Sequence, residues 1–328
     1  MVTALGWTGR EGRVVLAAMV ARVLAGRWPT PAERTLLRDA IRLAGFRRAA
    51  QGLVLRGLLG SAERAAVTTV LVPALEGLFT VAVSADDTGI GLEVLESGVW
   101  EPEVCGFYRR VLKPGMTVAD IGANIGFHAI HAAVLVGAGG RVIAVEPDRR
   151  NAALLRLAVR LNHGLAPITV VEAALADSDG ELTLSDLGNA ANSGARFTHA
   201  DRAVLEGLVH GPAPHFRTVP AMRWDERFAD TRVDFAKLDV EGYEPRVVAG
   251  MERMLRRDRP MVLSEYAPAN LRQLGGIEPE AYLRWFEERG YRTEILVSAA
   301  GETAPATAAE IAARAAGGHH AEVVFRPR

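Results

Sequence analysis

The stretch Val118-Ala119-Asp120-Ile121-Gly122-Ala123-Asn124-Ile125-Gly126-Phe127-His128 decides the fold expected of this 328-residue chain. Apolar residues lead to Asp120, a glycine-containing turn follows, and an apolar run resumes after Gly126. This order predicts a strand, a tight turn and a helix. At the carboxyl end of a strand in a doubly wound sheet, such a turn presents backbone N–H groups to a ligand, and glycine permits close approach. The segment therefore predicts both an α/β fold and the place of its ligand crevice.

Short apolar runs alternate with helical patterns on both sides of this turn. Alternation of this length predicts an open, mainly parallel sheet with helices on both faces. Two stretches interrupt it: 199–217 is interpreted as an insertion or loop over one face, and 299–318 as a loose excursion between the last strands. The predicted strands are 78–83, 117–121, 141–145, 168–173, 233–238, 260–265, 291–297 and 322–326, and the predicted helices are 99–112, 127–135, 151–161, 245–255 and 279–289.

Residues 1–77 differ in character and are predicted to form a helical N-terminal region that precedes a domain of residues 78–328. Thr30-Pro31-Ala32-Glu33 has the pattern of a capping box, an amphipathic run follows it, and a second covers 53–59. Arginine dominates this region. A solvated helix face, a docking surface for a partner protein and a lid over the active site are all consistent with that pattern.

Composition narrows the function classes. Lys and Arg total 38 against 39 Asp and Glu, whereas proteins that bind phosphate backbones carry an excess of base, so nucleic acid is not expected as a partner. Cys105 is the single cysteine, which fits a reducing cytoplasm. No apolar run reaches the roughly twenty residues of a membrane span, and none resembles a signal peptide. We expect a cytoplasmic protein without a membrane segment, of unknown oligomeric state.

The charge at the predicted crevice favours a cationic cofactor. A nicotinamide fingerprint reads G-x-G-x-x-G, but here Gly122 and Ala123 are followed by Asn124 in place of the second glycine. Asp120 places a carboxylate directly before the turn, where it would repel a pyrophosphate. A carboxylate suits the ammonium and sulfonium groups of S-adenosylmethionine. The sequence therefore predicts this cofactor, with Gly126 completing the turn.

Two further strand ends supply the rest of the predicted cofactor site. The strand 141–145 ends in Glu146-Pro147, and an acidic residue about twenty positions after the turn can accept hydrogen bonds from a ribose diol. The strand 168–173 carries Glu172, Ala173 and Ala174, which are candidates to border the adenine. Glu172 is equally well explained as a plain strand-end carboxylate.

The chain also resembles a known family. The segments that carry the resemblance are VADIGANIGFH (118–128), AVEPD (144–148), VVEAALADSDGELTL (170–184), DFAKLDVEGYE (234–244) and VLSEY (262–266). In this order they are similar to the FkbM family of S-adenosylmethionine-dependent methyltransferases, over roughly residues 78–297. The resemblance implies a Rossmann-like class I methyltransferase fold, with a seven-stranded sheet whose last strand is antiparallel. It also implies O-methylation, often of natural-product or sugar acceptors. Residues 199–217 fall in a variable part of the family, so the acceptor is not carried over.

Candidate catalytic residues follow from where parallel strands end. Transfer of a methyl group to a hydroxyl requires the acceptor to be positioned and its proton to be received. Asp239 is the preferred proton acceptor, and Glu241, Glu265 and His128 are the other candidates. Asp239 is also expected beside the cofactor, and Glu101 either folds over the methionine end of the cofactor or is a solvated loop carboxylate. Lys237 is expected in a buried ion pair. Asp239 and Glu241 could hold Mg²⁺, but no further ligand set is present and no metal is predicted.

The predicted function is therefore methyl transfer from S-adenosylmethionine to a hydroxyl of a small molecule. Three alternatives remain open. An RNA or protein methyltransferase is supported by the N-terminal arginines and opposed by the neutral charge. A nicotinamide-dependent oxidoreductase is opposed by Asp120 and Asn124. A noncatalytic scaffold is opposed by the acidic residues at several strand ends.

Overall fold

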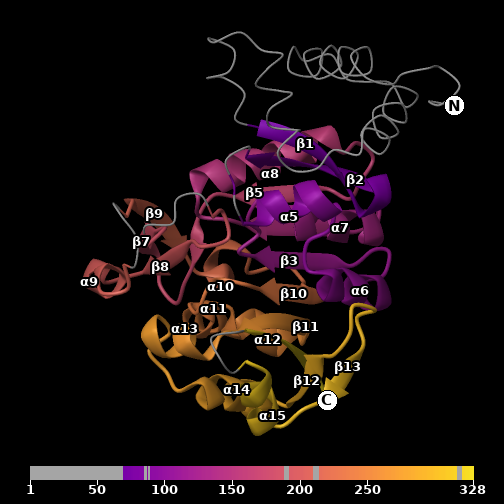
Figure 1. Cartoon of the computed structure of the whole chain (residues 1–328). Coiled ribbons are helices and arrows are strands. Elements are labelled where there is room, and N and C mark those ends of the chain that lie inside the picture. Colours follow the sequence, from indigo (N-terminus) through magenta and orange to yellow (C-terminus); the bar gives the residue numbers. More distant parts are fainter. Residues whose placement is uncertain (1–68, 85–86, 88, 188–191, 210–213, 316–319) are drawn as a thin grey trace, which may run out of the picture.

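A large mixed sheet forms the centre of the molecule. The computed structural model describes residues 69–84, 87, 89–187, 192–209, 214–315 and 320–328. The main sheet has eight strands in the order β13-β12-β14-β11-β10-β3-β4-β5, stacked in Figure 1 from β5 near the top to β12 and β13 near the bottom. These strands are β3 (Thr117–Ile121), β4 (Arg141–Val145), β5 (Ile168–Val171), β10 (Phe235–Leu238), β11 (Met261–Tyr266), β12 (Tyr291–Leu296), β13 (Thr303–Pro305) and β14 (Ala321–Pro327).

The direction of the strands confirms the predicted class I methyltransferase fold. Strands β5, β4, β3, β10 and β11 pair in parallel, and β14 lies antiparallel between β11 and β12. The eighth strand, β13, extends the edge beyond β12. This strand belongs to the stretch 299–318, which was expected to be a loose excursion. That expectation is wrong, because Thr307 and Glu310 form a capping box that starts α15 (Ala308–Arg314), and Ile311 of this helix is buried.

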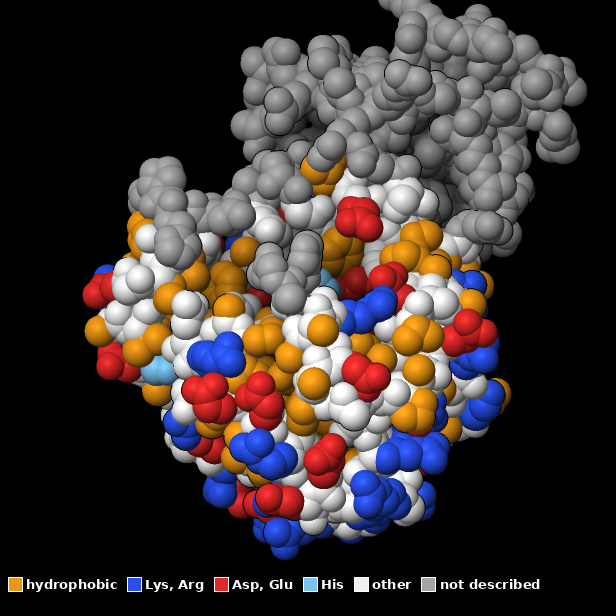
Figure 2. Space-filling view, turned by 60° about the horizontal axis from the view of Figure 1, so that its bottom comes forward, with side chains coloured by type: hydrophobic (Ala, Val, Ile, Leu, Met, Phe, Trp, Pro, Cys, Tyr) orange, Lys and Arg blue, Asp and Glu red, His pale blue; other side chains and the backbone are white. Residues whose placement is uncertain are grey.

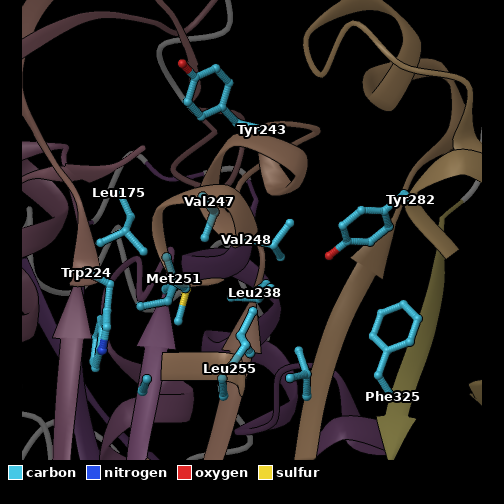
Figure 3. Packing of buried hydrophobic residues seen from close by; sticks show 14 of the residues in the cluster. Leu175, Trp224, Leu238, Tyr243, Val247, Val248, Met251, Leu255, Tyr282 and Phe325 are labelled. Carbon is cyan, nitrogen blue, oxygen red and sulfur yellow. The ribbon is translucent and has the colours of Figure 1, made fainter. Parts of the chain in front are cut away.

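Helices cover both faces of this sheet because strand residues alternate between two apolar clusters. Val118 of β3 packs with α6 (Pro102–Val111) and α7 (Phe127–Val136), and we call this side the α6/α7 face. Ala119 and Ile121 pack on the opposite side. The opposite face is covered by α11 (Glu244–Gly250), α12 (Glu252–Asp258), α14 (Pro279–Glu288) and α15. Figure 3 shows part of this core, in which Trp224, Met251 and Phe325 are fully buried.

A hairpin spans the predicted domain boundary between residues 77 and 78. β1 (Thr69–Ala74) and β2 (Phe79–Ser84) pair antiparallel around the 3-10 turn η2 (Leu75–Gly77). The prediction of helix is therefore wrong for residues 69–74. Their sequence, TVLVPA, is rich in β-branched and apolar residues, which favour a strand. Phe79 and Val81 pack with Leu154 and Ala158 of α8 (Arg149–Leu161), beside α5 (Ile90–Ser97). The rest of the predicted helical region, including 30–33 and 53–59, lies outside the described residues.

The segment 199–217, predicted as an insertion or loop, connects two strands of a second sheet and contains a short helix. The order of this sheet is β6 (Ala174–Leu175), β9 (Phe216–Met222), β7 (Gly180–Ser185) and β8 (Phe197–His199), with α9 (Arg202–Glu206) after β8. In Figure 1, β7, β8, β9 and α9 lie to the side of the main sheet. In β7, the buried residues Leu182 and Leu184 alternate with the more exposed Glu181 and Thr183, as expected of a strand with one buried face. Among the described residues, no helix is long and apolar enough to cross a membrane.

The remaining short helices are α10 (Trp224–Arg227) and α13 (Pro268–Gln273).

Candidate functional site

A cavity of about 700 Å³ opens at the carboxyl ends of the central strands. Strands β3, β4 and β10 contribute residues to its wall, as do the starts of α6 and α7 and the segment around β8. Most of the residues predicted from the sequence line it, namely Glu101, Asp120, Gly122, Ala123, Asn124, His128, Glu146, Pro147, Ala173, Ala174, Asp239, Glu241 and Glu265. Gly126 and Glu172 do not line it.

The turn between β3 and α7 depends on left-handed backbone conformations. Gly122 has φ 83°, Asn124 has φ 49° and Gly126 has φ 89°. A Cβ on Gly122 would overlap the carbonyl oxygen of Asp239, so glycine lets the turn pack against the end of β10. Gly126 is the N-cap of α7 and packs against Leu155. The role of Gly126 is thus to shape the turn from outside the cavity wall.

Glu146 is held by backbone donors at the end of β4. Its Oε2 accepts from the Asn124 N–H at 2.8 Å, and its Oε1 accepts from the Asp148 N–H at 2.7 Å. Burial raises the pKa of Glu146 to about 8, even though these donors lower it. Each carboxylate oxygen has a further lone pair, so the group is able to accept from a ribose diol. Asp148, by contrast, caps α8 by accepting from the Arg150 and Asn151 N–H groups.

Asp120 is a buried carboxylate without a hydrogen-bond partner. Its side chain is 1% exposed, it lines the cavity, and neither oxygen has a partner among the described residues. It lies directly opposite Lys237 in the parallel pairing of β3 with β10. Burial raises the pKa of Asp120, although Lys237 opposes that rise. A buried, unpaired carboxylate is costly, and a cationic ligand would offset the cost. The site therefore fits the ammonium and sulfonium charges of S-adenosylmethionine.

Lys237 is buried against a carboxylate, as the sequence predicts. Its Nζ lies 2.5 Å from Asp239 Oδ2, and it is on the α6/α7 face of β10. Burial alone would lower the pKa of Lys237, but Asp239, Glu101 and Asp120 raise it well above its ordinary value. One lysine thus compensates several carboxylates. The pKa values of Glu241 and Glu265 are raised well above normal, first by burial and then by the neighbouring carboxylates.

Glu101 and His128 come together across the covering helices. Glu101 Oε2 lies 2.8 Å from His128 Nε2. Glu101 is the N-cap of α6, with φ 45°, and His128 is in the first turn of α7. Burial would raise the pKa of Glu101, but Lys237 and His128 lower it to about 2. An ionised Glu101 favours the proton on Nε2, which leaves Nδ1 as an acceptor without a partner among the described residues. Glu101 is therefore not a solvated loop carboxylate.

Glu172 is placed away from the predicted adenine contact. Its Oε2 pairs with Arg156 Nη1 at 2.6 Å, and both side chains are about one-third exposed at 34% and 39%. β5 ends at Val171, and the chain then enters the second sheet at β6. The geometry thus favours the strand-end alternative, while Ala173 and Ala174 line the cavity.

Other residues of the cavity wall were not anticipated from the sequence. Phe197 and Thr198 come from β8, Ile90 from α5, and His320 from the segment before β14. The Ser193 carbonyl accepts from the Asn124 and Asn151 side chains, which ties this segment to the cofactor turn. None of these residues has a local sequence signal, because each reaches the cavity only through tertiary packing. Within the described ranges, no three His, Cys, Asp or Glu side chains form a group that could hold a metal ion.

Comparison with known proteins supplies the family. The Methyltransferase FkbM domain matches residues 120–293, which is more than half of the chain. The chain belongs to the FkbM methyltransferase family. It is thus a methyltransferase, and the predicted cofactor, S-adenosylmethionine, is confirmed with the family. No curated protein matches the sequence.

Several solved structures are distantly similar to this FkbM methyltransferase. A methyltransferase FkbM from Methylobacillus flagellatus KT has 15% identity and a TM-score of 0.40. The match covers 71% of this chain, but this chain spans only 52% of the Methylobacillus protein. Aeropyrum pernix fibrillarin with natively bound S-adenosyl-L-methionine has 14% identity and a TM-score of 0.39, and the match covers 69% of this chain and 76% of the fibrillarin. A SAM-dependent O-methyltransferase from Thermotoga maritima has 13% identity and a TM-score of 0.39, and the match covers 72% of this chain and 70% of the Thermotoga protein. Likenesses of this degree do not bear on the acceptor.

Proposed function

We propose that this FkbM methyltransferase transfers the methyl group of S-adenosylmethionine to a hydroxyl oxygen of a small molecule. The observation that carries the proposal is the Asp239 carboxylate, fixed by Lys237 at 2.5 Å in the same cavity wall as Asp120 and Glu146. Asp120 would neutralise positive charge on the cofactor, and Glu146 would hold its ribose. An oxygen acceptor must lose a proton as it is methylated, and Asp239 is within the same cavity to receive it.

The cofactor supplies a methyl group already activated on a sulfonium. The chain therefore has to hold the acceptor in line with that group and take up its proton. Asp239 would receive the hydroxyl proton as the acceptor oxygen takes the methyl group from the sulfonium. His128, oriented by Glu101, is the alternative acceptor, because its Nδ1 lone pair has no partner among the described residues.

A small acceptor is favoured over RNA by the charge of the wall. Asp239, Glu241 and Glu265 line the cavity, and these acidic side chains would repel a phosphate group wherever they are ionised. On the face shown in Figure 2, acidic and basic side chains are interspersed and do not form one large basic patch. An RNA substrate would ordinarily be steered by such a patch.

The test is a methyl-transfer assay with labelled S-adenosylmethionine and a panel of hydroxylated small molecules. We expect label in a small molecule and an Asp239→Asn variant whose kcat falls by about 10²- to 10⁴-fold. S-adenosylhomocysteine affinity, measured by calorimetry, should fall far less. The His128→Asn variant separates the two candidate bases, because it should retain most of its kcat if Asp239 receives the proton. Label found only in RNA or protein, or near-normal turnover of Asp239→Asn, would refute the proposal.

A further inference from the structure

A second cavity of about 470 Å³ adjoins the first. It lies among the segment after β11, the start of α14 and the end of α15. Glu241, Glu265 and His320 line both cavities, so these residues form a shared wall. The small side chains of Ala267, Ala312 and Ala315 are also part of the lining and leave room for a ligand.

Acidic side chains outnumber basic ones in the lining of the second cavity. Glu241, Glu265 and Glu280 line it, and Arg272 is the basic side chain that accompanies them with His320. The Arg272 guanidinium is half-exposed and pairs with Glu278 at 3.0 Å, so its charge is already matched. Within the described residues, Glu265 Oε2 is buried without a hydrogen-bond partner, and Oε1 has only a 3.5 Å contact with His320. A cation in this cavity would offset the cost of these carboxylates.

Tyr266 supplies an independent sign of a ligand. Its side chain is fully buried, it lines the second cavity, and its hydroxyl has no partner among the described residues. Burial, followed by the charge of Glu280, raises the pKa of Tyr266 to about 12. The phenol therefore remains a hydrogen-bond donor over the physiological range. Buried tyrosine hydroxyls ordinarily find a partner, so an oxygen of a bound molecule is expected here.

We propose that the second cavity is the acceptor site and that the acceptor is an amino alcohol, carrying a protonated amine beside its hydroxyl groups. The ammonium is matched by the Glu280 carboxylate, and the shared Glu241 and Glu265 side chains can accept hydrogen bonds from it. An oxygen of the acceptor accepts from the Tyr266 hydroxyl, and the hydroxyl to be methylated reaches past Glu241 and Glu265 into the first cavity, where Asp239 receives its proton. This inference rests on the proposed function, which it narrows to one substrate class.

The experiment measures binding to the full chain saturated with S-adenosylhomocysteine. The probes are amino alcohols of increasing size, each paired with its N-acetyl counterpart and with a carboxylate of the same skeleton. We expect at least one amino alcohol to bind about tenfold more tightly than its N-acetyl counterpart, and the carboxylates to bind most weakly, because one opposed or removed charge contact is worth about that factor.

Two variants localise the effect. Glu280→Gln should abolish the preference for the amine, and Tyr266→Phe should weaken amine and N-acetyl probes alike. Glu288→Gln makes the same charge change at an exposed position of the same helix, α14, and should preserve the preference. If no amino alcohol binds more tightly than its counterpart, or if Glu280→Gln keeps the preference, the inference is overturned. A protein that binds no S-adenosylhomocysteine contradicts the proposed function itself, whereas cofactor binding without amine preference contradicts this inference alone.

Discussion

At the scale of single residues, Asp120 combines burial with unsatisfied hydrogen-bonding capacity. Both of its oxygens lack partners among the described residues, and the side chain faces the cavity. Replacing it with asparagine keeps the shape and removes the charge. We expect Asp120→Asn to weaken S-adenosylmethionine binding by about 10- to 100-fold, since contacts between a buried charge and an opposite charge contribute about 1.5–3 kcal/mol.

The matched control for Asp120→Asn is Glu172→Gln, measured by the same calorimetric titration. Glu172 is paired with Arg156 outside the cavity, so its variant should bind the cofactor as the parent does. Equal losses in the two variants would contradict the assignment of Asp120.

Glu146 gives a pH dependence that can be checked with an uncharged nucleoside. Its folded-state pKa is raised from 4.5 to about 8, so near neutral pH it is mostly protonated, and a carboxylate accepts better than a carboxylic acid from a ribose diol. We expect the affinity for 5′-methylthioadenosine, which lacks a titrating amine, to rise about tenfold between about pH 7 and about pH 9. Calorimetry at both pH values measures this, and the Glu146→Gln variant should show a flat profile. A flat profile in the parent protein would contradict the prediction.

The raised pKa of Glu146 also makes stability depend on pH, but stability falls with rising pH whereas the affinity for the nucleoside rises. Between the unfolded-state pKa of 4.5 and the folded-state pKa of about 8, the folded protein holds a proton that the unfolded chain releases. The contribution of Glu146 to the free energy of unfolding is therefore largest near the lower value and declines as the pH rises through the higher one.

At the scale of elements, the turn between β3 and α7 is constrained by its contact with β10. Gly122→Ala would place a methyl group on the carbonyl oxygen of Asp239 and force a left-handed backbone on alanine. We expect a loss of at least about 2 kcal/mol in the free energy of unfolding, measured by urea denaturation. Gly115→Ala is the control, because Gly115 has φ 89° but no atom within 4 Å of the added Cβ. If both variants lose the same stability, backbone strain explains the effect without the clash.

At the scale of the whole molecule, Lys237 links strands and covering helices through charge. It neighbours Asp120 in the sheet, pairs with Asp239, and lowers the pKa of Glu101 on α6. We expect Lys237→Met to lower the free energy of unfolding by about 3–5 kcal/mol near neutral pH, because buried carboxylates lose their compensating cation. The loss should shrink as the pH falls toward about 5, since those carboxylates then take up protons in the folded state.

Urea denaturation at the two pH values measures the Lys237 effect, with Lys113→Met as the control. Lys113 is exposed, and its Nζ donates to the Arg110 carbonyl. A Lys237→Met variant that loses no more stability than Lys113→Met would show that the buried carboxylates do not depend on this lysine.

The pattern of apolar residues and glycine turns along the sequence was enough to predict much of the fold and the site at the carboxyl ends of the parallel strands. Strands 117–121 and 141–145 were predicted with the bounds that the structure has, because apolar runs between glycine turns report burial directly. Most predicted site residues line one cavity, because the carboxyl ends of parallel strands meet at one edge. Tertiary structure alone decided the Glu101–His128 pair, the place of Glu172, the second sheet and the contribution of His320. These depend on contacts between segments far apart in the chain, and such contacts leave no periodicity in the residues that make them.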